Sequence, residues 1–223
     1  MTLKLFSHYA CCFGVELTMY NGAALYYKEK FGQTTESAAA LASIFGWMNI
    51  CSRGLGGFFS DQWNKRYGMR GRIGWHAFCL MTEGILVFIF AHSHSLGGAV
   101  GVMAVFSFFV QMATGTTYAI VPYVDPPSTG SISGIVGAGG NVGAVCFGLG
   151  FRQMNYLDAF TLMGCVILFA AVSCAGIVIK GHSSLFCGHD TLYTTEKGAV
   201  DGVLVVPEKD DEKLMEISEE IDC

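Results

Sequence analysis

Charged residues are scarce in this chain of 223 residues. They make up 14% of the sequence, whereas apolar residues make up 52%. A soluble globular domain has about 25% charged residues. The shortage of charge therefore argues against a soluble domain and indicates a protein whose solvent is lipid.

Cysteine pairs at metal-binding or disulfide spacing are also missing. The sequence contains nine cysteines but no CxxC motif. Five cysteines stand singly within apolar runs: Cys51, Cys79, Cys146, Cys165 and Cys174. We interpret them as small buried apolar side chains, and we expect no metal site, no cofactor and no enzymatic activity.

A secretory signal is absent as well. The first apolar run, residues 3–27, is too long for one and carries Glu16 in its middle. We interpret this run as a membrane span.

The sequence contains six long apolar runs. A helix that crosses a hydrocarbon core needs about 20 residues. The expected spans are residues 5–27, 37–59, 73–91, 96–121, 130–151 and 157–179. Thr34, Thr35 and Glu36 resemble a helix N-cap before the second span. The sequence thus predicts an all-α membrane protein, with six transmembrane helices over residues 1–181.

Residues 182–223 have a different composition. Residues 1–181 carry ten Lys/Arg and seven Asp/Glu, a net charge of +3, while residues 182–223 carry three and eleven, a net charge of −8. A segment rich in like charge is typical of disorder. We expect a mobile, cytoplasmic acidic tail that the anionic inner leaflet repels, and an inert tail and a regulatory one both remain open.

The basic residues in the short connections predict the orientation. One side of the membrane collects Lys4, Lys65, Arg66, Arg70, Arg72 and Lys180, and the other collects Lys28, Lys30 and Arg152. Six against three places both termini in the cytoplasm.

A strongly basic loop is expected from Ser60 to Arg72. Together with the residues just before it, the loop forms an ordered pattern from Gly56 to Arg72, GGFFSDQWNKRYGMRGR, which includes Gly57, Asp61, Arg70 and Arg72. The glycine would let helix ends approach, and Asp61 could accept hydrogen bonds from a neighbouring helix N-terminus. A general positively charged inner loop would account for the basic residues alone, but the ordered pattern is more specific.

Three ionisable residues lie inside the expected spans. Arg53 lies eight residues before Asp61, about 12 Å deeper along a helix. Its side chain could extend to the headgroups, or it could face a cavity and mark a substrate path. Glu16 and Glu83 could pair with a basic group, stay protonated or carry a coupled proton.

The fifth span has a face of small residues. Ser133, Gly137, Asn141, Ala144 and Gly148 recur at helical spacing. Such a face suits either close helix packing or room for a small ligand. A nucleotide-binding glycine loop is excluded because no strand precedes it, and we expect no nucleic-acid partner.

Several motifs together resemble the second half of the nitrate/nitrite porter family of the major facilitator superfamily. They are TTYAIVPYV from Thr116, GSISGIVGAGGNVG from Gly130, GVELT from Gly14, and the loop pattern from Gly56. The resemblance covers residues 5 to about 190.

The resemblance implies a substrate site for nitrate, with nitrite as a second candidate substrate. In that family each half supplies one nitrate-binding arginine, and Arg53 stands at that place in an Asn49-x-x-x-Arg53 pattern. Tyr9 and Phe13 match aromatic residues that flank the anion, although ordinary core packing also explains them. A guanidinium offers a planar fork of donors to a planar anion. Asn141, Gly137, Gly139 and Gly140 could complete the hydrogen bonds.

Length is where the chain departs from the family. A full porter has two six-helix halves around a central site, and this chain has one. We expect a fragment of a twelve-helix, proton-coupled transporter in the plasma membrane, with nitrate, protons and the lipid bilayer as partners. It would also need its missing N-terminal half or a second chain. A non-transporting or half-size membrane protein, and a carrier for another small anion, remain open.

Overall fold

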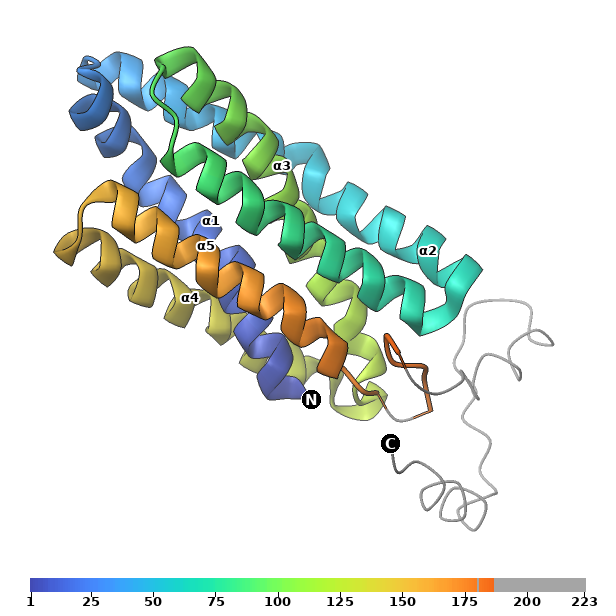
Figure 1. Ribbon diagram of the computed structural model, residues 1–223. Coiled ribbons are helices and arrows are strands. Elements are labelled where there is room, and N and C mark those ends of the chain that lie inside the picture. Colours follow the sequence, from blue (N-terminus) through green and yellow to red (C-terminus); the bar gives the residue numbers. More distant parts are fainter. Residues whose placement is uncertain (180, 187–223) are drawn as a thin grey trace, which may run out of the picture.

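The computed structural model describes residues 1–179 and 181–186 (Figure 1). Helices dominate this part of the chain. They are α1 (Thr2–Phe31), α2 (Thr35–Ala91), α3 (Leu96–Ile120), α4 (Thr129–Gln153) and α5 (Tyr156–Ser173), with short 3-10 turns η1 (Val121–Tyr123), η2 (Pro126–Ser128) and η3 (Cys174–Gly176). No strand occurs among the described residues, so the predicted all-α fold class is confirmed.

Helix α2 consists of two antiparallel arms, residues 35–67 and residues 69–91. Gly68 separates them with a φ of 65° and a ψ of −157°, a conformation that essentially only glycine adopts. Figure 1 shows α2 doubling back on itself at this point. A Cβ atom on Gly71 would lie 2.4 Å from the carbonyl oxygen of Trp63, so the arms touch next to the turn. The bundle therefore has six helical segments.

The connection between these arms differs from the loop expected from Ser60 to Arg72. Those residues continue the two helices, and Gly68 is the non-helical residue inside them. One left-handed glycine reverses the chain, so a long loop is unnecessary. Lys65, Arg66 and Arg70 can belong to these helices because their side chains are exposed.

Two other boundaries differ slightly from the pattern in the sequence. Helix α5 ends at Ser173 and the turn η3 follows, so helical structure stops before residue 179. Ser183 and Ser184, which we placed in the tail, are buried at 4% and 6% exposure and contact Arg70. The rest of the predicted tail, residues 187–223, lies outside the described residues.

The start of the second helix agrees with its sequence signal. Thr34 is the N-cap residue of α2, and its side-chain oxygen accepts a hydrogen bond of 3.2 Å from the Ser37 backbone N–H. Glu36 lies in the first turn, where a negative charge is favourable.

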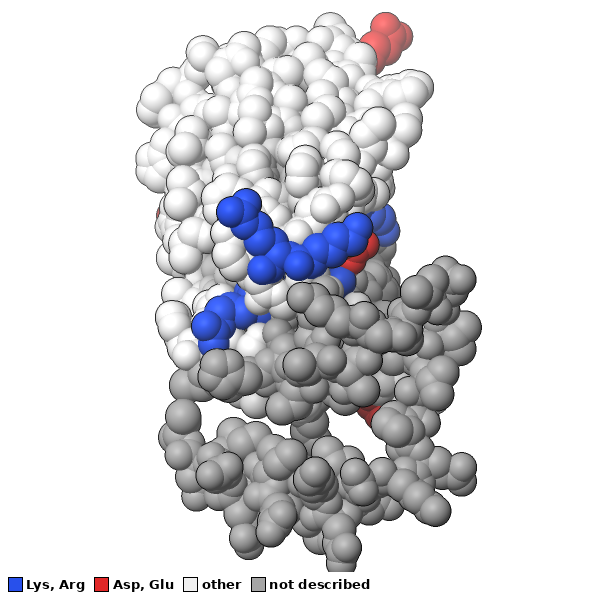
Figure 2. Space-filling view, turned by 90° about the vertical axis from the view of Figure 1, so that its right-hand side faces the viewer, with Lys and Arg blue, Asp and Glu red and all other residues white. Residues whose placement is uncertain are grey.

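Four segments are long and apolar enough to cross a membrane: Thr35–Ala91, Leu96–Tyr123, Pro126–Gln153 and Tyr156–Gly176. The helices run side by side in an elongated bundle. Figure 2 shows the Lys and Arg side chains gathered in one band across the face in view, beside a broad uncharged surface. This separation is typical of a membrane protein whose charged residues lie at the lipid headgroups.

Close backbone contacts at glycines hold the central helices together. A Cβ atom on Gly143 of α4 would lie 2.3 Å from the carbonyl oxygen of Ala10 of α1. Between α3 and α2, a Cβ atom on Gly115 would lie 2.2 Å from the carbonyl oxygen of Arg53. These contacts fix α1, α2, α3 and α4 at short separations around the residues described next.

Candidate functional site

Arg53 of α2 forms an ion pair with Glu16 of α1. Its Nη2 atom donates to Oε1 and Oε2 of Glu16, at 3.0 and 2.8 Å. Glu16 is 1% exposed, whereas the Arg53 side chain is 37% exposed. Asn49 and Tyr20 also donate to Glu16 Oε1, at 2.8 and 3.1 Å. The carboxylate is thus held by three side chains.

One edge of the Arg53 guanidinium has no such partner. The Nε atom is buried and makes no hydrogen bond to any described residue. A buried donor without an acceptor is costly, by about 1–3 kcal/mol. The side chain as a whole is 37% exposed, so an incoming anion could bind the exposed part of the guanidinium while Nη2 stays on Glu16.

Aromatic rings continue from Arg53 across the bundle. The guanidinium carbon lies 5.6 Å from the centroid of the Phe13 ring, which is within cation–π range. Phe13 stacks on Tyr9 at 5.1 Å, and Tyr9 meets Tyr118 of α3 edge to face at 5.1 Å. The structure therefore brings together Arg53, Phe13 and Tyr9, which the resemblance grouped.

Helix α4 packs against these rings with its glycine residues. A Cβ atom on Gly140 would lie 2.3 Å from Phe13 Cδ1, and one on Gly137 would lie 3.2 Å from the Tyr118 hydroxyl oxygen. Glycine at these positions leaves room for the rings. Gly139 instead packs against the backbone of Phe6, which is a helix contact. Asn141 is exposed on α4.

A hollow of about 530 Å³ opens beside this network. Its lining includes Tyr20 of α1, which binds Glu16, and Gly46, Trp47 and Ile50 of α2. Trp47 and Ile50 are 70% and 71% exposed. A second cavity of about 220 Å³, between α1, α4 and α5, does not include Arg53 in its lining. Neither lining includes Arg53 or Glu16, but the first hollow contains Tyr20, which donates to Glu16.

The motif residues beside the α2 turn form a second polar cluster. Arg72 is buried and its Nη2 atom donates to Asp61 Oδ1 at 2.7 Å. Its Nη1 atom donates to the carbonyl oxygen of Ala119 at 3.0 Å, and its guanidinium lies 4.9 Å from the Tyr123 ring centroid. Asp61 thus accepts from a side chain, not from the helix N-terminus that we expected. The cluster links both arms of α2 to α3 and η1.

Arg70 and Gly57 lie outside that cluster. The Arg70 backbone N–H donates to Ser183 Oγ, and its Nε atom donates to the Ser184 carbonyl oxygen, both at 3.2 Å. A Cβ atom on Gly57 would meet nothing within 4 Å.

Glu83 is fully buried in the second arm of α2. Neither carboxylate oxygen has a hydrogen-bond partner among the described residues. Of the three options that the sequence left open for these acids, pairing with a basic group applies to Glu16. The structure gives Glu83 no such basic partner among the residues it describes.

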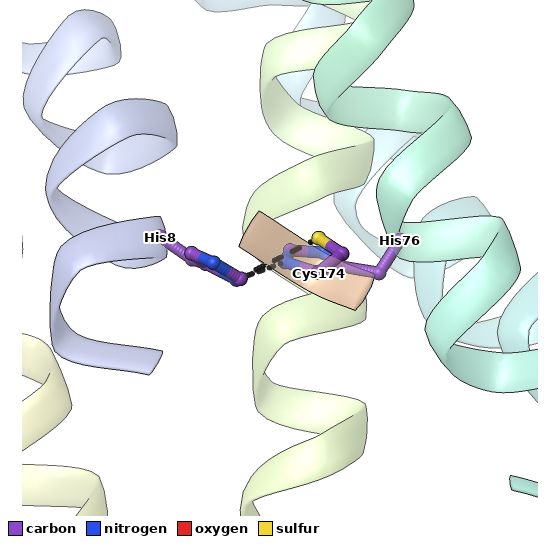
Figure 3. Close-up of side chains that lie close together, drawn as sticks. All are labelled: His8, His76 and Cys174. Atoms are coloured by element: carbon purple, nitrogen blue, oxygen red, sulfur yellow. Dashed lines mark hydrogen bonds between the residues drawn. The ribbon is translucent and has the colours of Figure 1, made fainter. Parts of the chain in front are cut away.

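Some residues of these networks carried no clear signal in the sequence. Tyr118 and Tyr20 occur in apolar runs where aromatic residues are common, and only the fold places them beside Tyr9 and Glu16. His8, His76 and Cys174 also meet in the bundle, although they are far apart in the sequence (Figure 3). Their spacing matches no metal-binding motif, which is why the sequence predicted no such cluster.

No family model and no solved structure matches the chain. Among curated proteins, it is 38% identical over 193 residues to "High affinity nitrate transporter 2.5" of Arabidopsis thaliana, a match that covers 85% of this chain and 38% of the relative. It is 30% identical over 172 residues to "Nitrate/nitrite transporter NrtP" of Nostoc punctiforme, covering 75% of this chain and 33% of the relative. It is also 34% identical over 173 residues to "Elsinochrome transporter 1" of Elsinoe fawcettii, covering 75% of this chain and 34% of the relative.

The chain thus spans between 33% and 38% of the length of these relatives. These similarities, together with six helical segments and the residue motifs, show that the chain belongs to the nitrate/nitrite porter family of the major facilitator superfamily.

Proposed function

We propose that this chain is the C-terminal six-helix half of a nitrate transporter that works by alternating access. The observation that carries the proposal is the Arg53 side chain, which is partly exposed and has an unused donor beside an aromatic wall. The names of the relatives support nitrate, and also nitrite, as the substrate. The complete site requires the N-terminal half, either in the same polypeptide or in a second chain.

In this proposal nitrate binds to Arg53 beside the rings of Phe13 and Tyr9. Nitrate is planar and carries one negative charge over three acceptor oxygens, so a guanidinium fork matches it better than an ammonium does. The rings exclude water and strengthen the charge interaction. Gly137 and Gly140 give the rings and the anion space on the α4 side, and Asn141 lies on the exposed face where the other half would contribute.

We further propose that Glu16 couples nitrate binding to a proton. The ionised carboxylate neutralises Arg53 and competes with nitrate for the same guanidinium. A proton on Glu16 would remove that competition, so each ligand would favour binding of the other. Glu83, which is buried without a hydrogen-bond partner among the described residues, is the second candidate to carry the proton.

The orientation and the polar cluster beside the α2 turn complete the proposal. With both termini in the cytoplasm, the Asp61–Arg72 pair and Arg70 lie on the cytoplasmic side, and the hollow beside Tyr20 opens toward the other side. Breaking the contacts of Arg72 with Asp61 and Ala119 would free the turn of α2 and the C-terminal end of α3 to move during transport. We place the transporter in the plasma membrane.

Arg53→Lys in the complete protein tests the anion site. We expect the nitrate half-saturation constant to rise by about tenfold or more, because charged hydrogen bonds are worth about 1.5–3 kcal/mol each. Nitrate uptake is measured in cells that lack their own carrier, with surface abundance quantified in parallel. Arg152→Lys, an exposed change in the last turn of α4, is the matched control. Unchanged nitrate affinity in Arg53→Lys would contradict the proposal.

The relative named for elsinochrome favours a second candidate function, which is transport of another solute by the same fold. Binding of labelled nitrate and of neutral solutes to the purified complete protein separates the two. A protein that binds a neutral solute and not nitrate would replace the first proposal with the second.

A further inference from the structure

His8, His76 and Cys174 form a buried cluster whose role is not explained by the proposed anion site. They come from α1, the second arm of α2 and η3, and they are 1%, 0% and 0% exposed. Their ligand atoms all lie within 4.8 Å of one another. Figure 3 shows the two rings projecting toward one another from facing helices, with Cys174 beside them.

Two hydroxyl groups contact the outer nitrogens of the rings. Thr116 Oγ1 lies 2.7 Å from His76 Nδ1 and 2.9 Å from the Ala113 carbonyl oxygen, so when it donates to the carbonyl it accepts from His76. Ser173 Oγ lies 2.7 Å from His8 Nε2 and 2.8 Å from the Ala170 carbonyl oxygen, and the same arrangement applies there. A neutral imidazole has one N–H, and in this arrangement it is on the outer nitrogen of each ring.

In this arrangement the inner nitrogens are both acceptors. His76 Nε2 and His8 Nδ1 lie 3.2 Å apart, and Cys174 Sγ lies 3.8 Å from His8 Nδ1. Two lone pairs that face each other in a buried space repel unless a positive charge lies between them. Outer-nitrogen hydrogen bonds to hydroxyl or carbonyl groups are also how proteins orient metal-binding histidines.

The separations suit a transition-metal ion. With metal–nitrogen bonds of about 2.05 Å and a metal–sulfur bond of about 2.3 Å, the 3.2 and 3.8 Å separations correspond to ligand–metal–ligand angles of about 100° and about 120°. Two imidazoles and a thiolate are ligands that zinc and copper(I) favour over magnesium or calcium. The three ligand atoms lie within 4.8 Å of one another, and binding of one ion requires Cys174 Sγ to lie within about 4.35 Å of His76 Nε2, the sum of the two bonds.

We propose that His8 Nδ1, His76 Nε2 and Cys174 Sγ bind one borderline or soft transition-metal ion, zinc or copper(I). Binding releases the thiol proton of Cys174 to solvent, and the sulfur then bonds to the metal as a thiolate. The ion fastens the beginning of α1, the second arm of α2 and the end of α5 to one another. The site contains none of the proposed anion-site residues, so it stands independently of nitrate transport.

The test uses the complete purified protein in detergent after removal of metals with a chelator. Zinc alone and copper(I) alone are added in separate arms, and the bound metal per chain is measured by mass spectrometry after desalting. We expect one equivalent of one of these metals and a higher melting temperature with that metal. Cys174→Ala and His76→Gln should lose both effects. Cys79→Ala, which changes another fully buried cysteine, is the matched control and should keep them.

Cobalt(II) substitution keeps the proposal testable if a variant is poorly folded. The wild-type protein should show a cobalt–thiolate charge-transfer band, and Cys174→Ser, which preserves the size of the side chain, should abolish that band. The metal that is retained at one equivalent per chain, zinc or copper(I), is the ion that the site binds. Wild-type protein that retains neither metal and shows no cobalt–thiolate band would overturn the proposal, and a proton shared between the inner nitrogens would then be the remaining explanation.

Discussion

Arg53 Nη2 and Glu16 Oε2 lie 2.8 Å apart, so the arginine proposed to bind an anion already has an internal anion. The pair joins the first arm of α2 to α1, and Glu16 is almost fully buried while Arg53 is partly exposed. An incoming anion would reach the arginine first. The buried carboxylate therefore sets how much positive charge the arginine offers.

Glu16→Gln tests this relationship. The amide has nearly the same shape and no charge, so Arg53 should be available to nitrate at every pH. We expect nitrate binding to the purified complete protein to tighten at neutral pH, by about tenfold for a change of 1.4 kcal/mol, and to lose most of its pH dependence. Proton movement that accompanies nitrate uptake should stop. Binding that keeps the wild-type pH dependence would argue against Glu16 as the coupling residue, and Glu83→Gln would then be the next variant.

Phe13→Leu tests the aromatic wall. The change removes the ring that packs against both Arg53 and Tyr9 while keeping an apolar side chain. A lost cation–π contact is worth about 0.5–2 kcal/mol, so the nitrate half-saturation constant should rise by roughly two- to thirtyfold. Phe78→Leu, at an exposed position on the second arm of α2, is the control. Equal nitrate affinities in the two variants would show that Phe13 contributes only to helix packing.

Gly143→Ala tests the close approach of α1 and α4. The added methyl group would lie 2.3 Å from the Ala10 carbonyl oxygen, so the two backbones must separate. Overpacking of this kind costs about 1–3 kcal/mol, and we expect a lower melting temperature in detergent. Gly130→Ala in the same helix meets nothing within 4 Å and should leave the melting temperature unchanged or raise it. Similar melting temperatures for both variants would contradict the packing described here.

Gly68→Ala tests the reversal inside α2. A side chain at a φ of 65° and a ψ of −157° is strained by about 1–3 kcal/mol, so the variant should be less stable and should insert less efficiently. Gly54→Ala lies in a regular part of the first arm with open space around it, and should be neutral or stabilising by up to about 1 kcal/mol. Thermal unfolding and membrane yield of the two variants, compared side by side, check this prediction.

Arg72→Gln tests the polar cluster beside the α2 turn. It removes the charge opposite Asp61 and shortens the reach to the Ala119 carbonyl oxygen. Loss of hydrogen bonds from a buried charged group costs about 1.5–3 kcal/mol each, so stability should fall. Lys65→Gln changes an exposed cation on the neighbouring arm and should shift the unfolding free energy by less than about 0.5 kcal/mol. Equal melting temperatures of the two variants would show that the cluster adds little stability.

The sequence by itself determined the solvent, the helices and the family. Long apolar runs, the Thr34 cap and the glycine spacing of α4 are local patterns, and each follows from the chemistry of neighbouring residues. Arg53 was identifiable for a similar reason, because a charge inside an apolar run is conspicuous without any knowledge of the fold.

Only the tertiary structure decided which distant residues meet. Nothing local distinguishes Gly68 from the other glycines near it, yet its left-handed conformation replaces a loop with a sharp reversal. The partner of Arg53 and the meeting of His8, His76 and Cys174 depend on how helices pack side by side. Packing brings together residues more than 90 positions apart, such as His76 and Cys174, and no pattern of neighbouring residues encodes that separation.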